Sequence, residues 1–255
     1  MLIVERQGSV LFVRLNRPDV RNAFNEELIA ALTQTFASVG EDVRAVVLSG
    51  EGSAFCAGGD LDYMRRMGES SYEENLADAR RLGMLFESVR ECRVPVVARI
   101  QGAAFGGGLG LAAASDIAVA ADDVRFSFSE VRLGLVPGTL SPVVVPKIGA
   151  GHARALFATG EVFGAEHALR IGLVHEVVPL AELDEAVERK LGAILAGGPN
   201  SVAGAKRLVL DQPLDREQCA RRIAAARASD EGLEGLRAFL EKRRASFVES
   251  RSPGG

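Results

Sequence analysis

The sequence contains no tryptophan and only two tyrosines, Tyr63 and Tyr72, among its 255 residues. Proteins that bind single-stranded nucleic acid stack bases on aromatic rings, so this chain offers little for that kind of contact. Basic residues are not in excess either, because 30 lysines and arginines stand against 34 acidic residues and leave a net charge of −4. A nucleic-acid-binding protein needs a basic face. We therefore predict no nucleic-acid partner.

Cysteine is also scarce. The three cysteines, Cys56, Cys92 and Cys219, are scattered and odd in number, which excludes a disulfide framework and gives no spacing for a zinc site. The lack of such a framework is typical of proteins in a reducing compartment. We therefore predict a cytoplasmic protein that holds no metal.

Long apolar runs are missing as well. The longest uncharged stretch, residues 100–115, is rich in glycine and shorter than the roughly 20 residues that cross a bilayer. Glu5 and Arg6 place charges where a signal peptide would need an apolar segment. We therefore predict no membrane partner.

Short apolar strands alternate with helices in the first half of the chain, an order typical of parallel strands joined by helical crossovers. We expect a helix capped by Asn25 and another over residues 72–92. The expected strands lie at 10–15, 44–49, 96–100 and 117–121.

Helical periodicity dominates the second half, with one strand expected at 173–178. The expected helices cover 152–159, 165–171, 180–195, 201–210, 216–228 and 231–247. We predict an α/β core over residues 1–195 and a helical C-terminal region over residues 196–255.

Two segments, residues 45–60 and 95–108, share one design: an apolar strand, small residues with a phenylalanine, consecutive glycines and a helix start. Glycine lets another group approach the backbone closely, and a helix start presents unpaired N–H groups. Two such turns on neighbouring strands can aim two N–H groups at one oxygen, as an oxyanion hole requires. The alternative is that the glycines only make tight turns and close helix packing.

Glu130 is the candidate acid. Phe126 and Phe128 alternate as in a strand that delivers Glu130 among apolar neighbours. Desolvation there raises the pKa of a carboxyl, as a general acid or base near neutrality requires. The alternative is a surface glutamate that pairs with Arg125 or Arg132.

Together these three elements resemble the crotonase superfamily, the enoyl-CoA hydratases and isomerases. The resemblance extends over residues 15–18, 22–23, 54–60, 102–108, 130–138, 168–174 and 241–247. It implies a spiral of ββα units with a helical C-terminal trimerisation region, and hence a homotrimer or a dimer of trimers. It also implies an acyl-CoA thioester substrate, with coenzyme A as part of that substrate and no separate cofactor.

The resemblance assigns roles to single residues. Gly59 and Gly107 match the residues whose N–H groups form the oxyanion hole, and Glu130 matches a catalytic glutamate. The main chain around Ala57 resembles the segment that receives the CoA adenine, and Phe239 and Lys242 resemble residues that reach the CoA of a neighbouring subunit. The full set of implied substrate contacts is Ala57, Gly58, Asp60, Gly106, Gly110, Gly138, Phe239 and Lys242. For Asp60, the residues favour a helix N-cap over a catalytic acid.

One position departs from the family pattern. The best-known hydratase of the family has two glutamates, and the first of them is replaced here by Gly110. The resemblance implies an enoyl-CoA hydratase with a single glutamate, similar to bacterial methylglutaconyl-CoA hydratases, and a Δ3,Δ2-enoyl-CoA isomerase is the alternative. A non-catalytic acyl-CoA-binding protein is the alternative of another class. If Gly110 leaves room beside the β-carbon of the substrate, a branched or carboxylated chain can fill it.

Two further interpretations concern neighbouring segments. Residues 108–113 match a dinucleotide-binding glycine pattern, but several residues separate these glycines from the preceding strand, which disfavours a nicotinamide enzyme. The acyl chain is expected to contact the region 63–83, with Met64, Met67 and Tyr72 as candidate wall residues.

Overall fold

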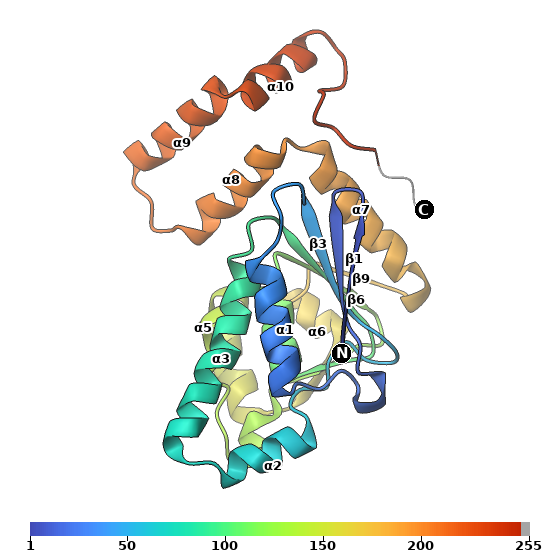
Figure 1. Ribbon diagram of the computed structural model, residues 1–255, viewed down its shortest axis with the longest axis vertical. Helices are drawn as coiled ribbons and strands as arrows, with labels where there is room; N and C mark the ends of the chain where they lie inside the picture. The colour runs from blue at the N-terminus through green and yellow to red at the C-terminus, as the bar shows by residue number, and fades with distance from the viewer. Residues whose placement is uncertain (251–255) are drawn as a thin grey trace.

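The computed structural model describes residues 1–250 and contains a twisted six-stranded sheet (Figure 1). The strand order is β1 (Leu2–Gln7), β2 (Val10–Leu15), β3 (Ala45–Gly50), β4 (Val96–Ile100), β6 (Ile117–Ala121) and β9 (Glu176–Val178). Only the β1–β2 pair is antiparallel among these strands. The parallel α/β organisation predicted from the sequence is confirmed.

Two strand predictions need correction. The expected strand 173–178 is shorter and begins at Glu176. The edge strand β1 was not expected, because four of its six residues are exposed and two of them are charged. An edge strand with no buried face lacks the alternation of polar and apolar residues by which strands are recognised.

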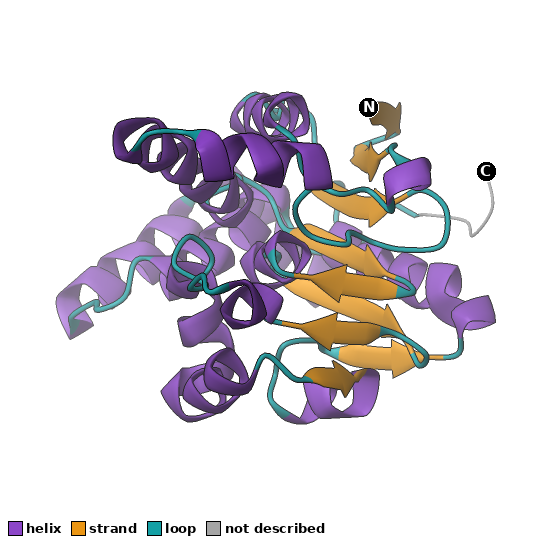
Figure 2. Ribbon diagram, turned by 90° about the horizontal axis from the view of Figure 1, so that it is seen from below, coloured by secondary structure: helices purple, strands orange, loops and turns teal. Residues whose placement is uncertain are grey.

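Helices cover both faces of the sheet. All six residues of β3 are buried, as a strand with both faces covered requires. On one side lie α1 (Glu26–Ala37), α3 (Tyr72–Arg90) and α4 (Gly107–Ala114), and on the other side α7 (Leu183–Ala196) packs on β4 and β6 (Figures 1 and 2). The remaining helices of this part are α2 (Leu61–Glu69), α5 (Ser141–Thr159) and α6 (Ala165–Arg170).

A second, smaller sheet joins β5 (Ala103–Phe105), β7 (Arg125–Ser127) and β8 (Val162–Gly164). The helix α5 starts well before the expected residue 152. Its early turns contain Pro142, whose missing N–H costs nothing in a first turn, and the helix bends at Gly149, where φ is 78°. That bend divides the apolar periodicity on which the expectation was based.

Three helices follow α7 and extend away from the sheet (Figure 1): α8 (Pro199–Leu210), α9 (Arg216–Ala228) and α10 (Asp230–Leu240). The expected helix 231–247 is wrong at its end, because the chain turns at Lys242, where φ is 54°. The following segment returns to the core, where the Arg44 side chain donates to the Phe247 carbonyl oxygen at 2.7 Å.

The helices α8 to α10 thus form a region outside the sheet whose two ends connect to the core. Within this region, the buried Lys206 side chain of α8 pairs with Asp116 at 2.8 Å and holds the helices against the core. The division into residues 1–195 and 196–255 stays a prediction, and residues 251–255 of the second region lie outside the described residues. Within residues 1–250, no helix is both long and apolar enough to cross a membrane.

Candidate active site

The two glycine-rich turns lie against each other at the carboxyl ends of β3 and β4. The Cys56 N–H donates to the Ala103 carbonyl oxygen at 3.1 Å, and the Phe105 N–H donates back to the Cys56 carbonyl oxygen at 3.0 Å. The two segments therefore pair like short strands just before their glycines. Each turn also leads into a helix, as expected: α2 follows the first and α4 the second.

Gly59 carries a free N–H group in the first turn. On either side of it, the Ala57 N–H donates to the Arg21 carbonyl oxygen and the Asp60 N–H donates to the Phe24 carbonyl oxygen, both at 2.9 Å. The Gly59 N–H itself has no hydrogen-bond acceptor among residues 1–250. The backbone pairing thus fixes this glycine while its donor stays available to a ligand.

Gly107 carries the corresponding group in the second turn. It is the first residue of α4, where helix geometry supplies no acceptor for its N–H. The preceding residue is fixed, because the Gly106 N–H donates to the Ser127 carbonyl oxygen at 3.0 Å. The positive end of the α4 dipole adds to the preference for negative charge at this point.

Glu130 lies beside these turns in the short 3₁₀ helix Ser129–Leu133. A β-carbon built on Gly106 would lie 3.4 Å from Glu130 Oε1 and 3.9 Å from Gly58 Cα, so the carboxyl group and both turns meet in one small region. Glu130 Oε2 is buried and has no hydrogen-bond partner among the described residues. Burial raises the pKa of the Glu130 carboxyl above its ordinary value.

The alternative of a surface ion pair at Glu130 is wrong. The side chain of Arg132 donates instead to the Gly160 carbonyl oxygen at 2.9 Å, and Glu130 forms no ion pair within the described part of the chain. A carboxyl group with a raised pKa and an unpartnered oxygen is suited to exchange protons near neutral pH.

Asp60 is a helix cap, as its position predicts. Its Oδ1 accepts from the N–H groups of Asp62 at 3.0 Å and Tyr63 at 3.3 Å, and its Oδ2 pairs with Arg17 at 2.8 Å. Burial acts to raise the pKa of this carboxyl, but the Arg17 hydrogen bond and the two N–H groups outweigh it and hold the pKa below its usual value. Asp60 is therefore ionised and structural rather than a proton donor.

Gly110 does not leave the room on which a branched or carboxylated substrate would depend. A β-carbon at this position would lie 2.5 Å from two ring atoms of Phe86, a residue of α3 that is 1% exposed. The ring occupies the volume into which a side chain at position 110 would project. Gly110 is a packing residue. It supplies no second acid, and the Phe86 ring leaves no empty space at this position.

The contact of Phe86 with Gly110 could not be predicted from the sequence. A glycine in the middle of an alanine- and leucine-rich helix signals that something packs closely against it, but one sequence does not say what.

Gly110→Glu is therefore expected to destabilise the fold rather than to supply a second acid. We expect a loss of about 1–3 kcal/mol from overpacking, measured as a lower Tm in thermal melts followed by circular dichroism. Gly192→Glu is the matched control, because Gly192 lies within α7 with no atom inside 4 Å of its built β-carbon. A Gly110→Glu protein that melts like wild type and hydrates faster would contradict this account of the site.

The other residues predicted to contact the substrate do not all lie at the two turns. Met64 lies over the first turn, since a β-carbon on Gly59 would be 3.0 Å from its Cγ, and Met67 packs against the core. Tyr72 is 75% exposed at the start of α3, and its contact with the acyl chain stays a prediction. Gly138 lies exposed in the loop after Glu130.

Phe239 and Lys242 are not brought to the turns of their own chain. Phe239 is 80% exposed on α10, which packs on α8 and α9. Lys242 follows the helix and is exposed as well. Their contact with CoA, which the resemblance assigns to a neighbouring subunit, stays a prediction.

Comparison with known proteins agrees with this fold. Residues 5–250 match the enoyl-CoA hydratase/isomerase family. The chain is 32% identical to the crotonyl-CoA hydratase of Syntrophomonas wolfei, with 97% of each chain covered. It is 30% identical to the 2,3-dehydroadipyl-CoA hydratase of Escherichia coli, with 96% of this chain and 98% of the relative covered. The solved enoyl-CoA hydratase from Mycobacterium smegmatis superposes with a TM-score of 0.92 at 35% identity, covering 97% of this chain and 99% of the other.

The fold and the paired glycine turns define a protein of the crotonase superfamily, so the resemblance predicted from the motifs is confirmed. Within it, the chain belongs to the enoyl-CoA hydratase/isomerase family. The narrower likeness to methylglutaconyl-CoA hydratases stays a prediction.

Proposed function

We propose that the protein is an enoyl-CoA hydratase, a lyase that adds water reversibly to a 2-enoyl-CoA thioester. One observation carries this: the Glu130 carboxyl, whose buried Oε2 has no hydrogen-bond partner among the described residues, lies beside Gly106, where the two turns with free N–H groups meet. The family relationship supplies the substrate class. Coenzyme A belongs to the substrate, and the proposed reaction takes no further cofactor.

The proposed chemistry follows from the groups present. The thioester oxygen accepts from the N–H groups of Gly59 and Gly107, which stabilises the enolate charge that develops there. Polarisation makes the β-carbon electrophilic. Glu130 takes a proton from water as the water oxygen bonds to the β-carbon, and it then returns that proton to the α-carbon. One carboxyl group thus serves both halves of the addition.

The absence of a second acid keeps isomerisation as the second candidate. With Phe86 packed against Gly110, Glu130 is the carboxyl that meets the turns in the described part of the chain. One carboxyl is enough to remove a proton from the α-carbon of a 3-enoyl-CoA and return it at the γ-carbon. The third alternative, a protein that binds acyl-CoA without turnover, is disfavoured by the unpartnered Oε2 of Glu130 beside the turns, together with the raised pKa of this carboxyl.

A substrate screen tests the proposal. Straight-chain, branched and carboxylated 2-enoyl-CoAs are incubated with the protein, and the products are analysed by mass spectrometry for the addition of one water. We expect hydration, and the 3-enoyl-CoA series run alongside reports isomerisation. Isomerisation alone, or binding of every thioester without turnover, would contradict the proposed activity.

We also propose a homotrimer or a dimer of trimers. The described part of α9 and α10 exposes large apolar side chains that one subunit does not cover: Ile223, Leu233, Leu236, Phe239 and Leu240. Large apolar side chains left exposed on two helices that contact each other indicate an interface. We expect sedimentation velocity to show trimers or hexamers, and Leu236→Glu with Leu240→Glu to shift the protein toward monomers. Leu169→Glu on α6 is the control, and a wild-type protein that sediments as a stable monomer would contradict the assembly.

A further inference from the structure

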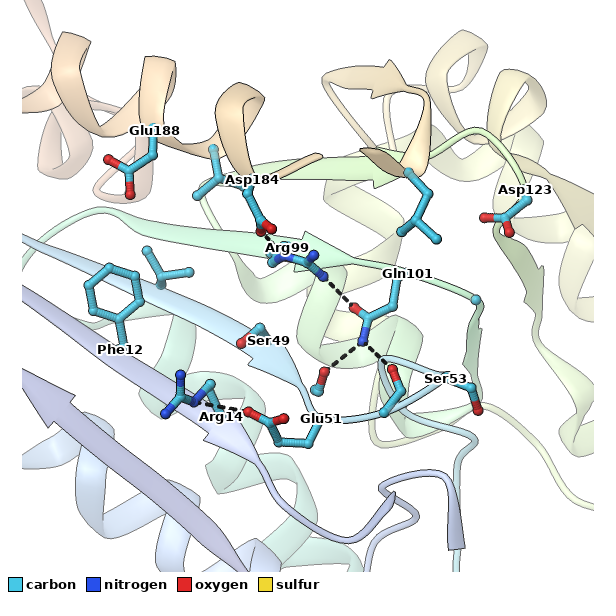
Figure 3. A pocket seen from close by; sticks show the side chains of 16 residues that line it. Phe12, Arg14, Ser49, Glu51, Ser53, Arg99, Gln101, Asp123, Asp184 and Glu188 are labelled. Carbon is cyan, nitrogen blue, oxygen red and sulfur yellow. Dashed lines mark hydrogen bonds and ion pairs between the residues drawn. The ribbon is translucent and has the colours of Figure 1, made fainter. Parts of the chain in front are cut away.

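The segment between β3 and the first glycine turn, residues 51–54, has no helix or strand of its own. Its carbonyl groups are nevertheless held by two carboxamide side chains. Asn22 Nδ2 donates to the carbonyl oxygens of Glu51 and Ala54, both at 2.8 Å. From the other direction, Gln101 Nε2 donates to the carbonyl oxygen of Gly50 at 2.6 Å and to that of Gly52 at 3.2 Å (Figure 3).

Gln101 belongs to the segment that carries the second turn. It directly follows β4, and the chain runs from it through β5 to Gly107. Its own carbonyl oxygen accepts from the Phe55 N–H at 2.9 Å, beyond the carbonyls that its side chain holds. Gly102 follows at φ +63°, where a β-carbon would overlap the Ser53 carbonyl oxygen. Gln101 thus contacts the segment before the first turn on both sides of Ser53. The chain that follows Gln101 forms the second turn.

The orientation of the Gln101 carboxamide is set by a hydrogen bond from Arg99, which itself forms an ion pair. Arg99 Nη1 donates to Gln101 Oε1 at 3.1 Å, so Oε1 is the acceptor and Nε2 faces the two carbonyl groups. Arg99 is held in turn by Asp184 of α7 at 2.5 Å (Figure 3). These residues line a cavity of about 760 Å³ on the face of the sheet that α7 covers. Gln101 itself is only 7% exposed, and its hydrogen bond to the Gly50 carbonyl oxygen is buried.

We propose that Gln101 is a positioning residue for the reaction: by tying the approach to the first turn to the start of the second, it sets the spacing of the Gly59 and Gly107 N–H groups. The inference rests on the proposed oxyanion hole. Such a hole works only when both donors point at the place where the charge develops, and a displacement of about 1 Å can cost a hundredfold in rate. Gln101 acts behind the turns and touches no substrate atom.

The first test is Gln101→Leu, which keeps the bulk of the side chain and removes its hydrogen bonds. We expect kcat for hydration to fall about ten- to hundredfold, with KM changed less than about threefold because the CoA portion still binds. Gln34→Leu, the same substitution at an exposed position of α1, is the control and should leave kcat unchanged. Arg99→Met keeps the Gln101 donor but frees its orientation, so a smaller loss of kcat is expected.

A binding measurement separates this inference from the proposed activity. Acetoacetyl-CoA is a β-keto thioester whose enolate places negative charge on an oxygen, whereas free CoA has no such oxygen. Calorimetric titration should show that Gln101→Leu weakens acetoacetyl-CoA about tenfold and CoA less than about twofold, whether or not the wild type hydrates any enoyl-CoA. Equal weakening of both ligands, or wild-type kcat and binding in Gln101→Leu, would overturn the positioning role.

Discussion

Glu130→Gln is expected to lower kcat for hydration at least about a hundredfold while leaving the binding of CoA esters nearly unchanged. The magnitude is the low end for a general acid–base group, and it is the full contribution here because the same carboxyl handles both proton transfers. The amide has nearly the shape of the carboxyl but neither takes nor returns a proton. Steady-state kinetics on the best 2-enoyl-CoA, with calorimetric binding of a non-reactive acyl-CoA, measures both effects.

The pH dependence gives an independent check on Glu130. As the base toward water, Glu130 must be ionised, so kcat/KM of the wild type should rise with pH through the pKa of this carboxyl, which burial places above its ordinary value. Glu130→Gln should lack that limb. Glu161→Gln, an exposed glutamate next to Gly160, is the control and should keep both the rate and the limb.

Stability should move in the opposite direction from activity. Because its pKa is raised in the folded state, Glu130 binds more protons when folded than when unfolded, and its ionisation costs stability as the pH rises from the unfolded to the folded pKa. Glu130→Gln removes this cost, so its Tm at pH 7 should equal or exceed that of the wild type. A variant with undiminished kcat would remove Glu130 from the mechanism, and one with a much lower Tm would show that its role is structural.

The fold could be predicted where local pattern and tertiary environment agree. The apolar runs of β4 and β6 are buried in the sheet, and both strands have the predicted bounds. The end of α10 could not be predicted, because residues 241–247 contain no glycine or proline to mark a stop, yet the chain turns at Lys242 to reach Arg44. Arg44 lies far away in sequence, and a contact of that kind leaves no mark on local periodicity.

The candidate site, like the fold, could be predicted from the sequence only in part. The paired turns and Glu130 could be predicted because each has a local signature of glycines or of an acid among apolar residues. The packing around Gly110 could not be predicted, since the Phe86 ring that lies against this glycine comes from α3. The hydrogen bonds of Asn22 and Gln101 could not be predicted either, because these side chains hold main-chain carbonyl groups of another segment. Any sequence can present such carbonyls, so the pairing leaves no motif.

Gly59→Pro is expected to lower kcat about a hundred- to a thousandfold, because it deletes one donor of the proposed oxyanion hole and keeps the other. Gly59 is a better position than Gly107 for testing the loss of the N–H donor alone. A β-carbon on Gly107 would lie 2.5 Å from the buried Phe24 ring, so any substitution there disturbs packing as well as the donor. At Gly59 the nearest atoms are the Cγ and Sδ of Met64, at 3.0 and 3.1 Å, in a flexible side chain that can shift.

Gly59→Ala is the matched control, since it adds a β-carbon at the same place but keeps the N–H group. If the donor matters, Gly59→Ala should stay within a few-fold of the wild-type kcat while Gly59→Pro loses nearly all turnover, with both variants folded by circular dichroism. The loss should fall on kcat more than on KM, because the hydrogen bond strengthens as negative charge collects on the thioester oxygen. Equal losses in the two variants would assign the effect to the displaced Met64 side chain, and a folded, fully active Gly59→Pro would remove Gly59 from the oxyanion hole.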